Sequence, residues 1–140
     1  MLDLELLRED YAVCRLPVGS PLPNGLLAHA SRGGVVSVTW TPDEVSIMCP
    51  AAQVPDGAIV ETPWRCFRVA GPVDLALTGI LASIISPLAD ARVNIFALST
   101  YDTDYLLVPE VRLTEAIAAL TGAGHRVSKA PSPIGSPTGT

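Results

Sequence analysis

The sequence predicts an α+β protein whose second half follows the element order βαββαβ and whose first half is a shortened copy of that order. In the second half, short apolar strand patterns alternate with two helical patterns. The segment Val38–Asp43, a strand that runs into a turn, recurs as Ala97–Asp102, and Pro50 then lies over Pro109. The chain has 140 residues, of which 49% are hydrophobic and 16% charged, so it can bury a core.

The first half contains short strand patterns and broken helical ones. Tyr11–Leu16 is typical of a strand, and Val35–Thr41 alternates between apolar and polar side chains, as a half-buried strand does. Val45–Cys49 returns as the second arm of a hairpin, after a turn that contains proline. Pro50–Gly57 is too short and too interrupted for a full helix. We therefore predict a degenerate N-terminal domain over residues 1–60.

The second half contains a complete set of elements. Trp64–Val69 is a strand pattern, and an apolar helical stripe follows, in which Asp74 is placed to cap the first turn. Val93–Ser99 is apolar on both faces and is predicted to be a central strand. The remaining elements are a returning strand at Asp104–Val108, a helix through Leu113 and Leu120 that ends at Gly122–Gly124, and a closing strand at His125–Ser128.

These elements predict a βαββαβ domain over residues 61–129. The last segment, residues 130–140, consists almost entirely of Pro, Ser, Gly and Thr. Such a composition does not bury a core, so we predict a disordered tail there.

The composition excludes several classes of function. The net charge is −5, and the single lysine, Lys129, and eight scattered arginines give no basic face for nucleic acid. Cys14, Cys49 and Cys66 lack the spacing of a metal site and lie in apolar runs, which predicts reduced core thiols and a cytoplasmic protein. The apolar stretch Leu75–Ala89 is too short to span a membrane. We expect no metal and no cofactor.

Two segments of the second half are suited to a small zwitterion. A helix that starts near Asp74–Gly79 presents N–H groups and a positive dipole end to a carboxylate, and Gly79 allows close approach. Asp104, beside apolar residues of a strand, could meet an ammonium group, and Tyr101 could close over a ligand. The alternative is purely structural: a helix cap, a packing glycine, an edge-strand acid, and a Thr100 hydroxyl that serves only the hairpin.

The pair Asp102 and Asp104 also has the spacing of a magnesium-binding D-x-D motif. The chain lacks the parallel βα units that accompany such a motif, and neither histidine, His29 or His125, has a catalytic partner pattern. We therefore predict a protein that is not an enzyme and has no catalytic residues.

Several of these segments resemble the ACT domain. The resemblance covers roughly residues 8–129. Within this range the sequence is similar to the small tandem ACT proteins that are related to the aspartokinase regulatory domains and to the cytosolic arginine sensors, the CASTOR proteins. The segments that carry the resemblance are Thr41–Ile47, Gly71–Leu75, Leu77–Ala82, Asn94–Thr100 and Ser99–Tyr105.

The resemblance implies two ferredoxin-like ACT units side by side, with antiparallel sheets and helices on one face, that bind an amino acid at their interface. Where the arginine sensors have a glutamate in the first helical turn this chain has Leu77, so we expect a ligand other than arginine. The positions that match the ligand contacts of the family are Asp74, Thr78, Gly79 and Ile80 at the helix start, Thr100, Tyr101 and Asp104 in the hairpin, and Ser46 and Ile47 in the other unit.

The sequence thus predicts a cytoplasmic regulatory protein that binds a small amino acid and forms a homodimer. Unpaired edge strands of such a sheet favour pairing with a second copy. The alternative is a protein–protein interaction module of the same fold that binds no small ligand.

Overall fold

The computed structural model describes residues 1–26, 34–70 and 78–130. Asp74, Leu77 and His29 lie outside the described residues, as does the predicted tail from residue 131 onward. The chain divides into two compact units. We call Met1–Arg8 with Trp64–Ala130 the C-terminal unit, and Glu9–Pro63 the N-terminal unit. Met1–Arg8, which the sequence analysis assigned to the first domain, therefore packs with the second half of the chain.

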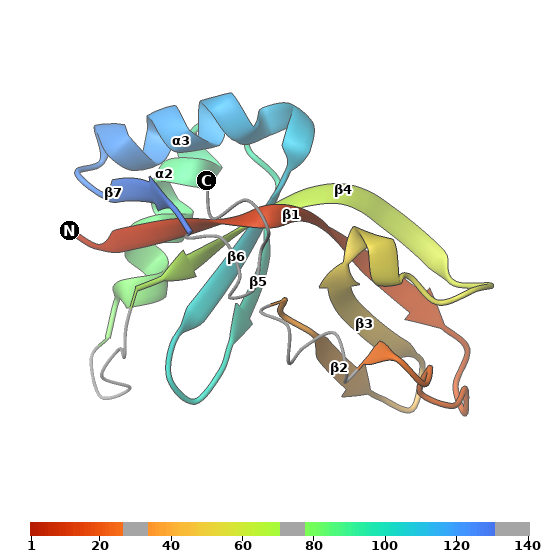
Figure 1. The fold of residues 1–140 in the computed structure, drawn as a ribbon. Helices are drawn as coiled ribbons and strands as arrows, with labels where there is room; N and C mark the ends of the chain where they lie inside the picture. The colour runs from red at the N-terminus through yellow and green to blue at the C-terminus, as the bar shows by residue number, and fades with distance from the viewer. Residues whose placement is uncertain (27–33, 71–77, 131–140) are drawn as a thin grey trace. The chain divides into compact units, whose positions relative to one another are not determined.

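The sheet of the C-terminal unit has the strand order β7–β1–β4–β6–β5 (Figure 1). Its β4–β6 and β5–β6 pairs are antiparallel, and β7 runs parallel to β1. Along the chain the order is β4, α2, β5, β6, α3, β7, which is the predicted βαββαβ order, and the first residues of β1 enter the sheet between β7 and β4. The bounds are β1 Asp3–Leu16, β4 Ile59–Val69, α2 Ile80–Asp90, β5 Phe96–Ser99, β6 Asp104–Pro109, α3 Leu113–Gly122 and β7 Arg126–Lys129.

Both helices cover the same face of this sheet, as Figure 1 shows for α2 and α3. They share one apolar core with the strands, in which Leu88 of α2 and Leu120 of α3 are fully buried. The strand residues of this core alternate along each strand, as the pleat of a sheet requires. They are Leu4 and Leu6, Phe67 and Val69, and Leu106 and Val108. The α+β fold with helices on one face is thereby confirmed.

The prediction that Val93–Ser99 forms a central strand was wrong. Regular pairing begins only at Phe96, and β5 is the edge strand of the C-terminal unit. The apolar character of the segment has another cause, because Val93 and Ile95 precede the strand and pack into the core as the chain leaves α2. Burial of that connection, and not a second covered sheet face, explains the continuous apolar run.

In the N-terminal unit, the second half of β1 pairs antiparallel with β3 (Val45–Pro50), which pairs antiparallel with β2 (Ser37–Trp40). A single 3-10 turn, η1 (Ala51–Gln53), stands where a complete unit would have a helix. The core of this unit includes Ala12 and Leu16 of β1 and Val45 and Ile47 of β3. No helix in the described part of the chain is long and apolar enough to cross a membrane.

The two hairpins, β2–β3 and β5–β6, have the same register at an offset of 59 residues, so the repeat inferred from the sequence is present in the structure. Ser37 pairs with Met48 as Phe96 pairs with Leu107, and each hairpin ends in a proline followed by a 3-10 turn. Their turns are also alike, because the N–H of Thr41 donates to the carbonyl of Glu44 at 3.0 Å, and that of Thr100 to Thr103 at 2.8 Å.

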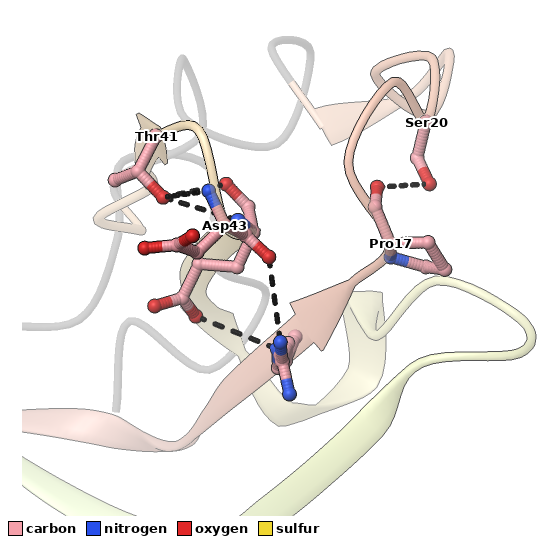
Figure 2. A network of polar contacts seen from close by, with 6 residues as sticks. Pro17, Ser20, Thr41 and Asp43 are labelled. Carbon is pink, nitrogen blue, oxygen red and sulfur yellow. Dashed lines mark hydrogen bonds and ion pairs between the residues drawn. The ribbon is translucent and has the colours of Figure 1, made fainter.

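Figure 2 shows the first of these turns, in which the hydroxyl of Thr41 accepts hydrogen bonds from the N–H groups of Asp43 and Glu44. Arg15 of β1 reaches the same turn, with its guanidinium 3.4 Å from the carbonyl oxygen of Asp43. The threonine therefore closes the turn locally, while the arginine ties it to the neighbouring strand.

All three cysteines are buried and reduced, as predicted. Burial raises the pKa of the Cys49 thiol to about 12, and the neighbouring Cys14 adds to this rise. We expect both thiols of the folded protein to resist alkylation at pH 8, because the reactive thiolate is then roughly 0.01% of Cys49. Mass spectrometry after treatment with iodoacetamide, with and without urea, measures this. Modification of Cys49 in the folded protein at the rate of the unfolded chain would contradict it.

The same pKa shift makes the stability of the fold dependent on alkaline pH. The folded pKa lies above the unfolded value of 9.0, so the folded chain holds this proton more tightly. Its contribution to the free energy of unfolding is complete below pH 9 and is lost as the pH rises from 9 towards 12. Urea unfolding of the wild type at pH 8, 10 and 11 should show this loss, and Cys49→Ala should show a smaller one.

Candidate ligand-binding hairpin of the C-terminal unit

The turn between β5 and β6 is fastened to the end of β4. Thr103 is 4% exposed, and its hydroxyl donates a 2.6 Å hydrogen bond to the carbonyl of Val69. The hydroxyl of Thr100 accepts from the N–H of Thr103 at 3.3 Å, so the turn is closed by its own side chains. Thr103 was not predicted to be an anchor, because a threonine in a polar turn carries no signal of a distant partner.

Asp104 opens β6 and is half-buried. Ser99, directly opposite on β5, donates a 2.6 Å hydrogen bond to its Oδ1 atom. Among the described residues, no arginine, lysine or histidine nitrogen lies within 4.0 Å of this carboxylate. The structure therefore holds a half-buried, oriented carboxylate without a cationic protein partner at the positions described, which is the arrangement that an ammonium group would complete.

Helix α2 begins at the C-terminal end of the predicted segment Asp74–Gly79. Gly79 is its N-cap, with φ of 80° in the left-handed region, and no side chain among the described residues caps the first turn. A left-handed backbone favours glycine because a Cβ atom would be strained there. Thr78 and Gly79 are exposed and Ile80 is half-buried, so the N–H groups at this helix start are near solvent. Asp74 itself is not among the described residues.

His125 fixes the first turn of α2 in place. The ring is 6% exposed, with Nδ1 3.1 Å from the N–H of Leu2 and Nε2 2.9 Å from the carbonyl of Ser83. Nδ1 accepts the hydrogen bond from Leu2, so Nε2 carries the proton and donates to Ser83. His125 is thus a packing residue that ties α2 to the start of β1.

The other predicted contact residues lie in different environments. Tyr101 is 86% exposed at the tip of the β5–β6 turn. Ser46 is half-buried in β3, between Thr39 and Arg15 on the two neighbouring strands. Ile47 is 0% exposed, and its side chain belongs to the core of the N-terminal unit. The structure therefore brings together Thr100, Tyr101 and Asp104 on one anchored hairpin, and the participation of Ser46 and Ile47 stays a prediction.

Metal-ligating side chains do not gather in the part of the chain that is described. No group of three or more His, Cys, Asp or Glu residues there could hold a metal ion. In the D-x-D segment, Asp102 lies exposed in the turn while Asp104 accepts the hydrogen bond from Ser99.

The C-terminal unit thus combines the βαββαβ order with a hairpin that is anchored to β4 and a helix that begins at a glycine. A family model of the ACT domain matches residues 59–122, and a model of an N-terminal domain matches residues 9–57. Residues 59–122 thus match the ACT domain, and the chain is similar in fold to the aspartokinase regulatory domains and in sequence to the cytosolic arginine sensors.

Three similar proteins illustrate the relation. Cytosolic arginine sensor for mTORC1 subunit 1 from Bos taurus is 32% identical in an alignment of 105 positions that covers 67% of this chain and 32% of that protein. The chain thus spans about a third of the length of this relative. Protein Atu0741 from Agrobacterium tumefaciens has a TM-score of 0.81 and 37% identity, covering 93% of this chain and 94% of that one. The regulatory subunit of aspartate kinase from Thermus thermophilus has the same fold, with a TM-score of 0.57 at 18% identity, covering 86% and 95%.

Proposed function

We propose that this chain is a regulatory protein that binds a free amino acid. The observation that carries the proposal is Asp104, a half-buried carboxylate that Ser99 orients and that no cation among the described residues neutralises. An α-amino group would supply the missing positive charge, and a charge-assisted hydrogen bond of this kind is stronger than a neutral one. The similarity to arginine sensors and to aspartate kinase regulatory subunits supports the same class of ligand.

The carboxylate of the ligand would be held by the start of α2. The first-turn N–H groups have no side-chain cap among the described residues, and the positive end of the helix dipole favours an anion. Thr78, Gly79 and Ile80 supply this part of the proposed site, and Thr100 and Tyr101 flank the ammonium end. We propose a ligand other than arginine, since Leu77 stands where the arginine sensors have an acid.

We propose that the protein acts in the cytoplasm, not as an enzyme but through ligand-dependent contacts, including those of a homodimer. Buried, reduced cysteines fit a reducing compartment. Strand β5 is the edge of the sheet among the described residues, where one side of its backbone pairs with no described strand and could pair with another copy. Light scattering with and without ligand measures the assembly, and a monomer under both conditions would contradict this part of the proposal.

A thermal-shift screen of the twenty common amino acids tests the function. Binding to the folded chain alone adds about 2.7 kcal/mol to the free energy of unfolding at a ligand concentration of 100 Kd. We expect one amino acid, or a small group of similar ones, to raise the melting temperature in a saturable way. Calorimetric titration of the best ligand then gives the affinity and the stoichiometry.

The alternative is an ACT-fold interaction module without a small ligand. The exposure of Tyr101, 86% at the tip of the hairpin, favours this alternative, because large exposed aromatic residues commonly mark protein contacts. No melting-temperature shift with any of the twenty amino acids would select this alternative over amino-acid binding.

A further inference from the structure

A small pocket in the C-terminal unit gathers positive charge. Its volume is about 150 Å³, and it is lined by Leu6, Arg8, Arg65 and Lys129. These residues come from the adjacent strands β1, β4 and β7, and Lys129 stands opposite Leu6 in the parallel pairing. Three of the nine cationic residues of an otherwise acidic chain therefore line one pocket.

The cationic residues lie on the helix-covered face of the sheet. Side chains alternate along a strand, so Arg8 shares a face with Leu6, and Arg65 shares one with Phe67. Leu6 and Phe67 are both buried in the core beneath the helices. The positive charges therefore lie on the same face of the sheet as the apolar core, beyond its last buried residues. Leu6, which is 5% exposed, forms the apolar wall of the pocket.

Arg65 is held in position by the protein. It is half-buried with a buried Nε atom, and its NH2 group donates a 3.1 Å hydrogen bond to the carbonyl of Leu7. A fixed guanidinium loses little side-chain entropy when an anion binds, which favours binding. Arg8 and Lys129 are exposed and can adjust around a ligand.

We propose that this pocket binds a small oxyanion, either a phosphate or a carboxylate group. Guanidinium groups match both oxyanions with paired hydrogen bonds, and a lysine adds a compact point charge. The anion would add to the contacts that Arg8 and Arg65 already make within the protein. A pocket of about 150 Å³ fits an ion of phosphate size and not a nucleotide.

This pocket and the proposed amino-acid site lie at opposite ends of the same sheet. Arg65 pairs with Val108 near the end of β6, whereas Asp104 begins that strand. The oxyanion site is therefore separate from the hairpin, and it would be present whether or not an amino acid binds.

Calorimetric titration of the full chain with inorganic phosphate, in chloride buffer of matched ionic strength, tests the proposal. We expect saturable binding to the wild type and at least about a tenfold higher Kd for Lys129→Gln, because a hydrogen bond to a charged group is worth about 1.5–3 kcal/mol. The matched control is Arg92→Gln, which removes one exposed positive charge that does not line the pocket. Circular dichroism verifies that both variants are folded.

Acetate and citrate in place of phosphate distinguish the two sources of the oxyanion. Tighter binding of phosphate indicates a phosphate site, and tighter binding of citrate indicates a carboxylate site. Phosphate also stabilises proteins in general, because it is excluded from their surface. That general effect is the same in the wild type, Lys129→Gln and Arg92→Gln, so a difference between these three proteins reports on the pocket. No saturable heat with any of the anions, or equal affinity in the wild type and Lys129→Gln, would overturn the proposal.

Discussion

Replacing Asp104 by asparagine is expected to lower the affinity for the amino-acid ligand by at least about 30-fold. The substitution removes the negative charge and leaves the ligand ammonium without its counter-ion. Loss of one partner from a hydrogen-bonded charge pair in a binding site costs about 2–5 kcal/mol, and each 1.4 kcal/mol is a factor of ten. Calorimetric titration with the amino acid found in the thermal-shift screen measures the change.

Asparagine at residue 104 keeps an oxygen acceptor for Ser99, so the β5–β6 hairpin should fold as before. The matched control is Asp102→Asn, which removes the same charge from the exposed part of the same turn. We expect this control to bind with nearly wild-type affinity. If Asp104→Asn is folded and binds as tightly as Asp102→Asn, then Asp104 is not the ammonium partner and the proposed orientation of the ligand is wrong.

The two hairpins could be predicted from the sequence because their two signals, side-chain alternation and turn residues, are local. Alternating side chains fix which face of a strand is buried, and the turn residues Thr41 and Thr100 close their turns with neighbours in the chain. A repeated proline after each hairpin marked where the second arm ends. The repeat at Val38 and Ala97 indicated that the two hairpins are equivalent, and their registers in the structure are the same at an offset of 59 residues.

The first half of β1 was missed because its outer face is acidic. Asp3 and Glu5 alternate with buried leucines, and acidic residues are depleted in strands. In the structure these acids pair with Arg126 and Arg68, at 2.6 Å in each case. The partners lie far away in the sequence, so no local pattern reveals that a strand is stabilised there.

The candidate site could be predicted only in part, for a similar reason. Asp104 was identified because an acid beside apolar strand residues is unusual in any context. The start of α2 was placed too early, since Asp74 is a good capping residue but Gly79 is the observed cap. Thr103 was overlooked because its role depends entirely on the carbonyl of Val69, which the fold brings to it.

Thr103→Val is expected to lower the free energy of unfolding by about 1–3 kcal/mol. Valine fills the same space but donates no hydrogen bond, so the carbonyl of Val69 loses the hydroxyl that lies 2.6 Å away in a buried position. The cost of leaving a buried polar group without a partner sets this range. Urea unfolding followed by circular dichroism measures the change, because a small folding unit gives a cooperative transition.

Thr121→Val is the matched control, since Thr121 is exposed and its hydroxyl bonds only to carbonyls of its own helix. Surface changes of this kind alter the free energy of unfolding by about 0.5 kcal/mol or less. Thr103→Val should also weaken amino-acid binding several-fold, because an unfastened turn must be ordered again when the ligand binds. A stability loss with unchanged affinity would show that Thr103 anchors the fold without organising the site. Equal stability of the two valine variants would show that the turn does not depend on this hydrogen bond.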